Sequence, residues 1–141
     1  MTIYILDTDH ISLFLGNYLP VRDRVLQSRS DCSIAIISVQ EIFNGWVGQL
    51  NRVENEAYKI EIYQRLHLTT QFIQQMPVFN YDRAASIQYQ QIINVNPLLA
   101  KRRLEKDMRI AAIALAHKAT ILTRNKRDFE QVPKLTIEDW S

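Results

Sequence analysis

Four acidic residues of this sequence stand where a folded chain could bring carboxylates together. Asp7 directly follows residues 2–6, a run that is mostly apolar or β-branched. Glu41 and Asp128 follow two further apolar runs, and Asp107 opens an alanine-rich stretch. Carboxylates that converge repel one another, and a hard divalent cation such as Mg²⁺ or Mn²⁺ is an effective way to hold them ionised.

The element that must position Asp7 is a β-strand at residues 2–6. A run without polar alternation is typical of a strand buried on both faces, as in a parallel sheet. Residues 33–37 and 119–123 have the same character and predict two further strands. Because the junctions between strands and the following helices lie on one edge of a parallel sheet, we expect the four acids to converge there.

Helical segments separate these strands, and the alternation predicts a three-layer α/β/α sandwich around a parallel sheet of about four or five strands. Short strands are also predicted at residues 77–79 and 134–137. Helices are expected at about residues 10–16, 20–29, 38–48, 52–74, 83–94 and 98–118, the last of them in one or two pieces. No repeat or linker interrupts residues 1–141, so we expect a single domain.

Each acid also has a purely structural explanation. Ser38 and Glu41 have the spacing of a capping box, in which Ser38 is the N-cap of the helix. Asp9 is expected to cap the first helix. Asp107 could complement a helix dipole, and Asp128 could be a loop or cap residue. These explanations stay open for each acid alone, whereas the four acids together favour a metal site.

The composition is that of an ordinary globular protein, with 47% hydrophobic and 23% charged residues. No apolar run reaches the roughly 18 residues of a membrane span, so no membrane association is expected. The single cysteine, Cys32, excludes an intramolecular disulfide and suits a cytoplasmic location. With three scattered histidines besides it, the chain offers few zinc ligands.

Positive charge is concentrated in the last part of the sequence. Residues 101–141 carry ten Lys and Arg against six Asp and Glu, whereas residues 1–100 carry seven against nine. A basic surface beside an acidic metal site suits a phosphodiester substrate, whose backbone is bound by cations. A solvated helix face is the alternative explanation for the same cluster.

Four segments, taken in order, resemble the motifs of PIN-domain ribonucleases, and most closely those of the VapC toxins of toxin–antitoxin modules. These segments are residues 5–9, 38–41, 107–114 and 122–129, and they span nearly the whole chain. Each motif is loose by itself, but the ordered set is specific. The resemblance implies a PIN-like fold for the chain as a whole.

Carried over by position, the resemblance implies a set of metal-binding, catalytic acids made of Asp7, Glu41, Asp107 and, as a more variable fourth member, Asp128. Asn125 stands at a neighbouring position that is acidic in some relatives. The hydroxyl groups expected to support the acids belong to Thr8, Ser38 and Thr123. Glu105 lies close enough to Asp107 to be an alternative ligand, although the apolar helical stripe favours Asp107.

The activity that the resemblance implies is Mg²⁺- or Mn²⁺-dependent cleavage of RNA by water. The cations expected to contact the RNA backbone are Arg109, Arg124, Lys126 and Arg127. A homodimer and a cognate antitoxin that covers the site are the implied protein partners. Two alternatives are a catalytically idle module that binds nucleic acid or a partner protein, and a haloacid-dehalogenase-like phosphatase with Asp7 as its nucleophile.

Overall fold

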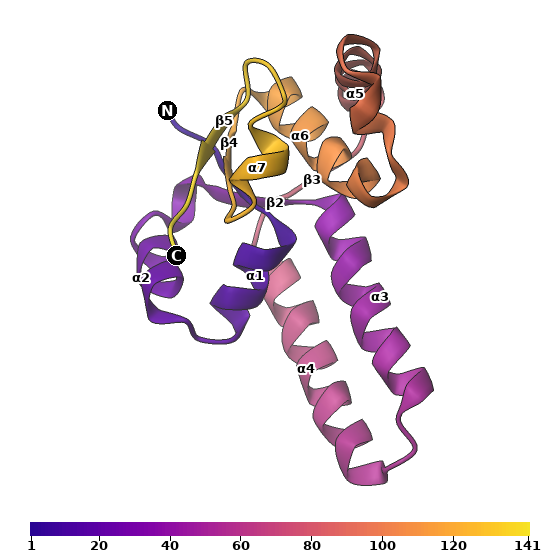
Figure 1. The fold of residues 1–141 in the computed structure, drawn as a ribbon. Helices are drawn as coiled ribbons and strands as arrows, with labels where there is room; N and C mark the ends of the chain where they lie inside the picture. Colours follow the sequence, from indigo (N-terminus) through magenta and orange to yellow (C-terminus); the bar gives the residue numbers. More distant parts are fainter.

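A five-stranded parallel sheet is the centre of the computed structural model, which describes residues 1–141 (Figure 1). Its strands are β1 (Tyr4–Leu6), β2 (Cys32–Ala35), β3 (Val78–Phe79), β4 (Thr120–Leu122) and β5 (Thr136–Glu138). They lie in the order β3-β2-β1-β4-β5, and every neighbouring pair is parallel. The predicted three-layer α/β/α fold is therefore confirmed.

Helices cover both faces of this sheet. They are α1 (Thr8–Leu15), α2 (Leu19–Gln27), α3 (Ile36–Arg52), α4 (Glu56–Gln74), α5 (Arg83–Val95), α6 (Glu105–His117) and the short α7 (Lys126–Phe129). Three 3₁₀ turns lie at Arg29–Asp31, Pro97–Ala100 and Arg102–Leu104. The last predicted helical stretch is thus divided into two 3₁₀ turns and α6. None of these helices is both long and apolar enough to cross a membrane.

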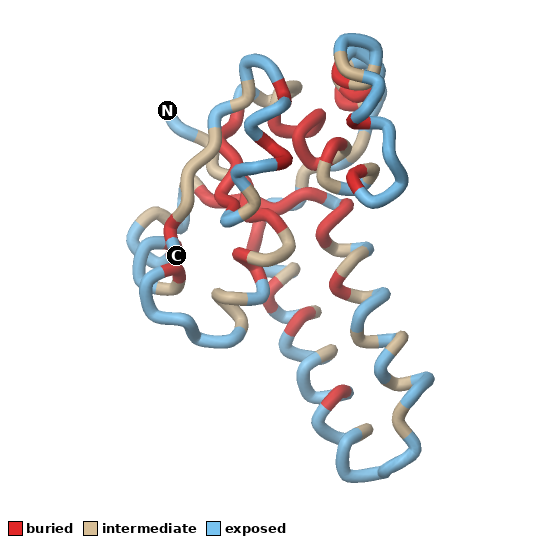
Figure 2. Tube along the Cα trace, in the orientation of Figure 1, coloured by how far each residue is buried: buried red, intermediate tan, exposed pale blue.

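Strand β1 is buried on both faces, as its unbroken apolar sequence predicted. Ile5 belongs to an apolar core shared with α5 and α6, whereas Leu6 belongs to a second core shared with α1, α2 and parts of α3 and α4. Both side chains are completely inaccessible to solvent. Figure 2 shows that buried residues concentrate around the sheet. The two apolar cores both include residues of the sheet.

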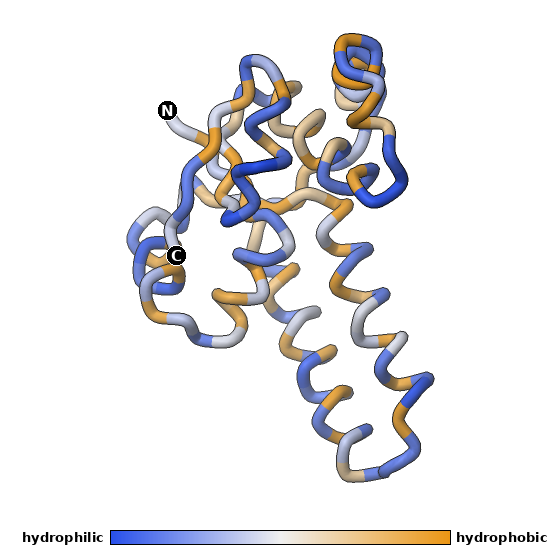
Figure 3. The backbone as a smooth tube through the Cα atoms, in the orientation of Figure 1, coloured by the Kyte–Doolittle hydropathy of each residue, from blue (hydrophilic) through white to orange (hydrophobic).

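Helices α3 and α4 form a hairpin that extends away from the sheet (Figure 1). The far half of the hairpin is mostly exposed (Figure 2), and apolar and polar positions are mixed along it (Figure 3). Its exposed large apolar side chains are Ile36 at its base and Val47, Tyr58, Ile60, Tyr63 and Leu68 further along. The hairpin thus presents apolar surface to the solvent.

The buried face of α6 combines three alanines with the larger Met108, Ile110 and Ile113. Ala111, Ala112 and Ala114 are all fully buried in the core that contains Ile5. The side chain of alanine is a single methyl group, so α6 can pack closely against its neighbours, of which α5 makes the most extensive contact. This packing brings Asp107, in the first turn of α6, toward the carboxyl ends of the strands.

Candidate metal centre

The sheet has a topological switch point between β1 and β4. From β1 the chain continues to β2 and β3 on one side, whereas β4 and β5 lie on the other. Such a point leaves a crevice at the carboxyl ends of the strands. A pocket of about 340 Å³ lies there, and all seven lining residues are non-hydrophobic: Asp7, Thr8, Asp9, Ser12, Glu41, Asp107 and Asn125. We call it the acidic pocket.

Asp7 joins β1 to α1 at the floor of the acidic pocket. It is only 5% exposed, and its Oδ1 accepts a hydrogen bond of 2.8 Å from the backbone N–H of His10. Asp7 is therefore the N-cap of α1, and the prediction that Asp9 caps this helix is wrong. The helix begins at Thr8, directly after the strand, so the cap position falls on the first acid.

Glu41 reaches the acidic pocket from the second turn of α3. The hydroxyl of Thr8 donates to Glu41 Oε1 at 2.7 Å and lies 3.0 Å from the hydroxyl of Ser38. The predicted capping box is wrong, because α3 begins at Ile36 and has Ala35 as its N-cap. Ser38 lies inside the helix and is fully buried, so its hydroxyl supports the pocket instead.

Asn125 connects the two acids that come from the last third of the chain. Its side-chain N–H groups donate to Asp107 Oδ2 at 3.3 Å and to Asp128 Oδ2 at 3.0 Å. Its own backbone N–H donates to the buried hydroxyl of Thr123 at 2.8 Å. Asp128 does not line the acidic pocket and is joined to it through the side chain of Asn125. Of the two candidates for the fourth position, Asn125 is the one that lines the pocket.

The side chains of Asp107 and Glu105 point in different directions. Asp107 lines the acidic pocket, whereas Glu105 pairs with Arg109 one turn further along α6. Burial, together with the negative charges of Glu41 and Asp7, raises the pKa of Asp107 from 3.8 to about 6. The amide of Asn125 opposes this rise, and the charge of Asp128 adds to it.

The acidic pocket fits a hard divalent cation. Its donors are carboxylate, amide and hydroxyl oxygens, without a thiolate, which is the donor set that Mg²⁺ and Mn²⁺ prefer. The pKa of Asp107 is raised first by burial and then by the charges of Glu41 and Asp7, and a bound cation would relieve that repulsion. The residues that could hold such an ion are Asp7, Glu41 and Asp107, with Asn125 beside them.

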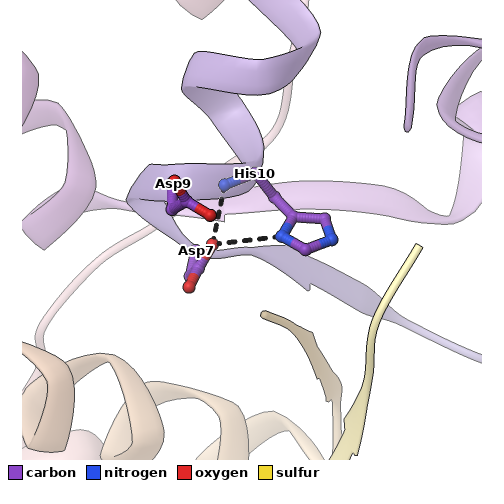
Figure 4. A group of neighbouring side chains, drawn as sticks. All are labelled: Asp7, Asp9 and His10. Carbon is purple, nitrogen blue, oxygen red and sulfur yellow. Dashed lines mark hydrogen bonds and ion pairs between the residues drawn. The ribbon is translucent and has the colours of Figure 1, made fainter. Parts of the chain in front are cut away.

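A second group of possible metal ligands, formed by Asp7, Asp9 and His10, is less suitable (Figure 4). Asp9 already forms a bidentate pair with Arg124, at 2.6 and 2.8 Å. His10 is completely buried, and its Nε2 accepts a hydrogen bond from the backbone N–H of Trp140. Neither contact was foreseen from the sequence, because both partners come from the far end of the chain.

The four cations predicted to contact RNA are not equivalent in the structure. Arg124 lies at the rim of the acidic pocket through its pair with Asp9, and Lys126 and Arg127 are exposed on α7. Arg109 instead lies over the ring of Tyr89, at 4.5 Å from its centroid. Arg124, Lys126 and Arg127 therefore lie toward the edge of the sheet that carries the pocket, whereas Arg109 lies against α5.

Neither a protein-family model nor a curated protein sequence matches the chain. The chain does match solved structures. A chain of DNA-bound VapBC from Salmonella typhimurium is 27% identical, with 100% of each chain covered and a TM-score of 0.79. VapBC2 from Rickettsia felis, bound to a promoter DNA fragment, is 18% identical, with 99% of this chain and 100% of that chain covered and a TM-score of 0.78. VapBC-1 from nontypeable Haemophilus influenzae is 22% identical, with 99% and 98% covered and a TM-score of 0.78.

The sheet order and the acids at its switch point define a PIN-like α/β fold. Within that class, the chain is similar to the VapC-type proteins of VapBC complexes over its whole length. The resemblance inferred from the sequence motifs is thereby confirmed.

Proposed function

We propose that this protein is a metal-dependent endoribonuclease and the toxin of a toxin–antitoxin pair. The observation that carries the proposal is the acidic pocket, in which burial and the charges of Glu41 and Asp7 raise the pKa of Asp107. The likeness to VapBC structures supports the proposal. The cations Arg124, Lys126 and Arg127, which follow β4, support a phosphodiester substrate, whose backbone they could bind.

Asp7, Glu41 and Asp107 would hold the Mg²⁺ or Mn²⁺ ion, with Asp128 as outer support. When bound, such an ion supplies an activated water for attack on phosphorus and stabilises the charge of the leaving oxygen. Thr8 fixes the rotamer of Glu41 through the 2.7 Å hydrogen bond. Asn125 fixes Asp107 in the same way and screens it from Asp128.

The cations at the rim would position the RNA. Arg124, Lys126 and Arg127 follow β4 closely in the chain, and Arg103 lies 3.5 Å from Asp128 of α7. These cations would attract a phosphodiester toward the acidic pocket. Arg124 is held in place by its pair with Asp9 until a phosphate competes for it.

The proposed antitoxin would bind the groove between α1, α3 and α4. This groove has a volume of about 520 Å³ and combines apolar residues such as Phe14, Ile42 and Trp46 with Arg22 and Arg65. It shares Ser12 with the acidic pocket, so a segment bound in the groove could extend a basic side chain to the acids. We further propose a homodimer that acts in the cytoplasm.

Incubation of the purified protein with total bacterial RNA in Mg²⁺, Mn²⁺ or EDTA tests the proposal. We expect discrete fragments with either metal, none with EDTA, and none from Asp7→Asn, whose side chain can still cap α1. Asp23→Asn removes an acid that is exposed on α2 and should cleave like the wild type. Cleavage that survives EDTA or Asp7→Asn would contradict the proposed chemistry.

A further inference from the structure

His10 is a fully buried polar residue in the first turns of α1. The backbone N–H of Trp140 donates to its Nε2 at 3.2 Å, and Asp139 Oδ1 lies 3.6 Å from the same nitrogen. A backbone amide always carries its proton, so Nε2 must be the acceptor in this contact. The neutral imidazole consequently carries its own proton on Nδ1.

The Nδ1 atom of His10 faces the floor of the acidic pocket. It lies 3.5 Å from Asp7 Oδ1 and has no hydrogen-bond partner, although it is completely buried. The same Oδ1 accepts a hydrogen bond of 2.8 Å from the backbone N–H of His10. The backbone nitrogen and the ring Nδ1 of this residue thus approach one carboxylate oxygen (Figure 4). A buried N–H without a partner is costly, and a small rotation of the Asp7 carboxylate would satisfy it.

The segment after β5 fixes the imidazole from the opposite side. Trp140 is only 3% exposed, and its indole N–H donates to Glu138 Oε1 at 3.2 Å. Its ring contacts Tyr4 of β1, with centroids 4.8 Å apart, and lies under Arg24, 4.6 Å from the ring centroid. The amide that selects the tautomer of His10 is therefore held by β1, α2 and β5 together.

We propose that His10 is a positioning residue for the metal site: its Nδ1–H directs the carboxylate of Asp7, and the backbone of Trp140 keeps the proton on that nitrogen. Donors on Oδ1 leave Oδ2 of Asp7 available to the acidic pocket. Hydrogen bonds of this kind orient metal-binding carboxylates and commonly contribute about 10- to 100-fold in metal affinity. The inference rests on the proposed function, because it requires Asp7 to bind the ion.

Two substitutions separate the two nitrogens of His10. His10→Asn ends at the position of Nδ1, so it keeps a donor for Asp7 and loses the acceptor for Trp140. His10→Gln extends to the position of Nε2, so it keeps the acceptor and loses the donor. Mn²⁺ binding followed by electron paramagnetic resonance should weaken about tenfold or more in His10→Gln and stay within about threefold of the wild type in His10→Asn.

The outcomes distinguish this inference from the proposed function. Unchanged Mn²⁺ affinity in both variants, or an equal loss in both, would overturn the inference while leaving the metal site intact. Absence of Mn²⁺ binding by the wild type would overturn the metal site and the inference with it. A measurement on the wild type covers the case in which a variant does not fold: nitrogen-15 shifts of the His10 ring should show the proton on Nδ1, and a proton on Nε2 would refute the proposal.

Discussion

Asp107→Asn should make the metal-free protein more stable at neutral and alkaline pH. Burial and the charges of Glu41 and Asp7 raise the pKa of Asp107 from 3.8 to about 6. A carboxyl group whose pKa is higher in the folded state binds its proton more tightly there, so ionisation costs folding free energy. This cost is absent below about pH 4, grows as the pH rises toward 6 and is complete above it.

The size of the effect follows from the size of the pKa rise. Each pKa unit corresponds to about 1.4 kcal/mol of free energy. A rise in the pKa of Asp107 from 3.8 to about 6 therefore corresponds to about 3 kcal/mol of unfolding free energy above pH 6. The pocket is open to solvent, which screens part of the repulsion, so we expect about 1–3 kcal/mol. Asparagine has the same shape, and its side-chain oxygen can still accept from Asn125.

Urea unfolding in EDTA, followed by tryptophan fluorescence, measures this difference. We expect Asp107→Asn to exceed the wild type in unfolding free energy at pH 8 and to match it at pH 4. The exposed Asp23→Asn should change either value by less than about 0.5 kcal/mol. Mg²⁺ should narrow the difference at pH 8, because it stabilises the wild type by binding. A destabilised Asp107→Asn, or an equal gain at both pH values, would refute the reasoning.

Three further predictions concern side chains around the acids. Thr8→Val removes the hydroxyl that donates to Glu41, so calorimetry should show about tenfold weaker Mn²⁺ binding; an unchanged affinity would contradict the role of that bond. Asn125→Asp places a fourth carboxylate near Asp107, besides those of Glu41, Asp7 and Asp128, and should cost about 1–2 kcal/mol of unfolding free energy in EDTA at pH 8, with recovery in Mg²⁺. Arg124→Gln should weaken RNA binding and reduce the slope of log affinity against log salt by about one; an unaltered slope would remove Arg124 from the RNA interface.

The parts of the fold that were predictable depend on patterns within short segments. The unbroken apolar run of β1 predicted a strand buried on both faces, and the structure places this strand between two apolar cores. Convergence of the acids then follows from the geometry of a parallel sheet. Asp82, too, caps α5 as its position before the helix indicates.

What the sequence could not reveal depends on contacts between distant segments. Ser38 has the spacing of a capping residue, but its hydroxyl contacts Thr8, 30 residues away, and the helix starts earlier. The pairing of Asp9 with Arg124 bridges 115 residues. No local pattern distinguishes such a buried or paired side chain from a free one, so the roles of both residues required the fold.

The most direct test of the metal site is an anomalous difference map from a crystal soaked in Mn²⁺. We expect one strong peak in the acidic pocket, about 2.1 Å from carboxylate oxygens of Asp7, Glu41 and Asp107. A peak on Asp9 and His10 instead, or no peak at a saturating Mn²⁺ concentration, would contradict it.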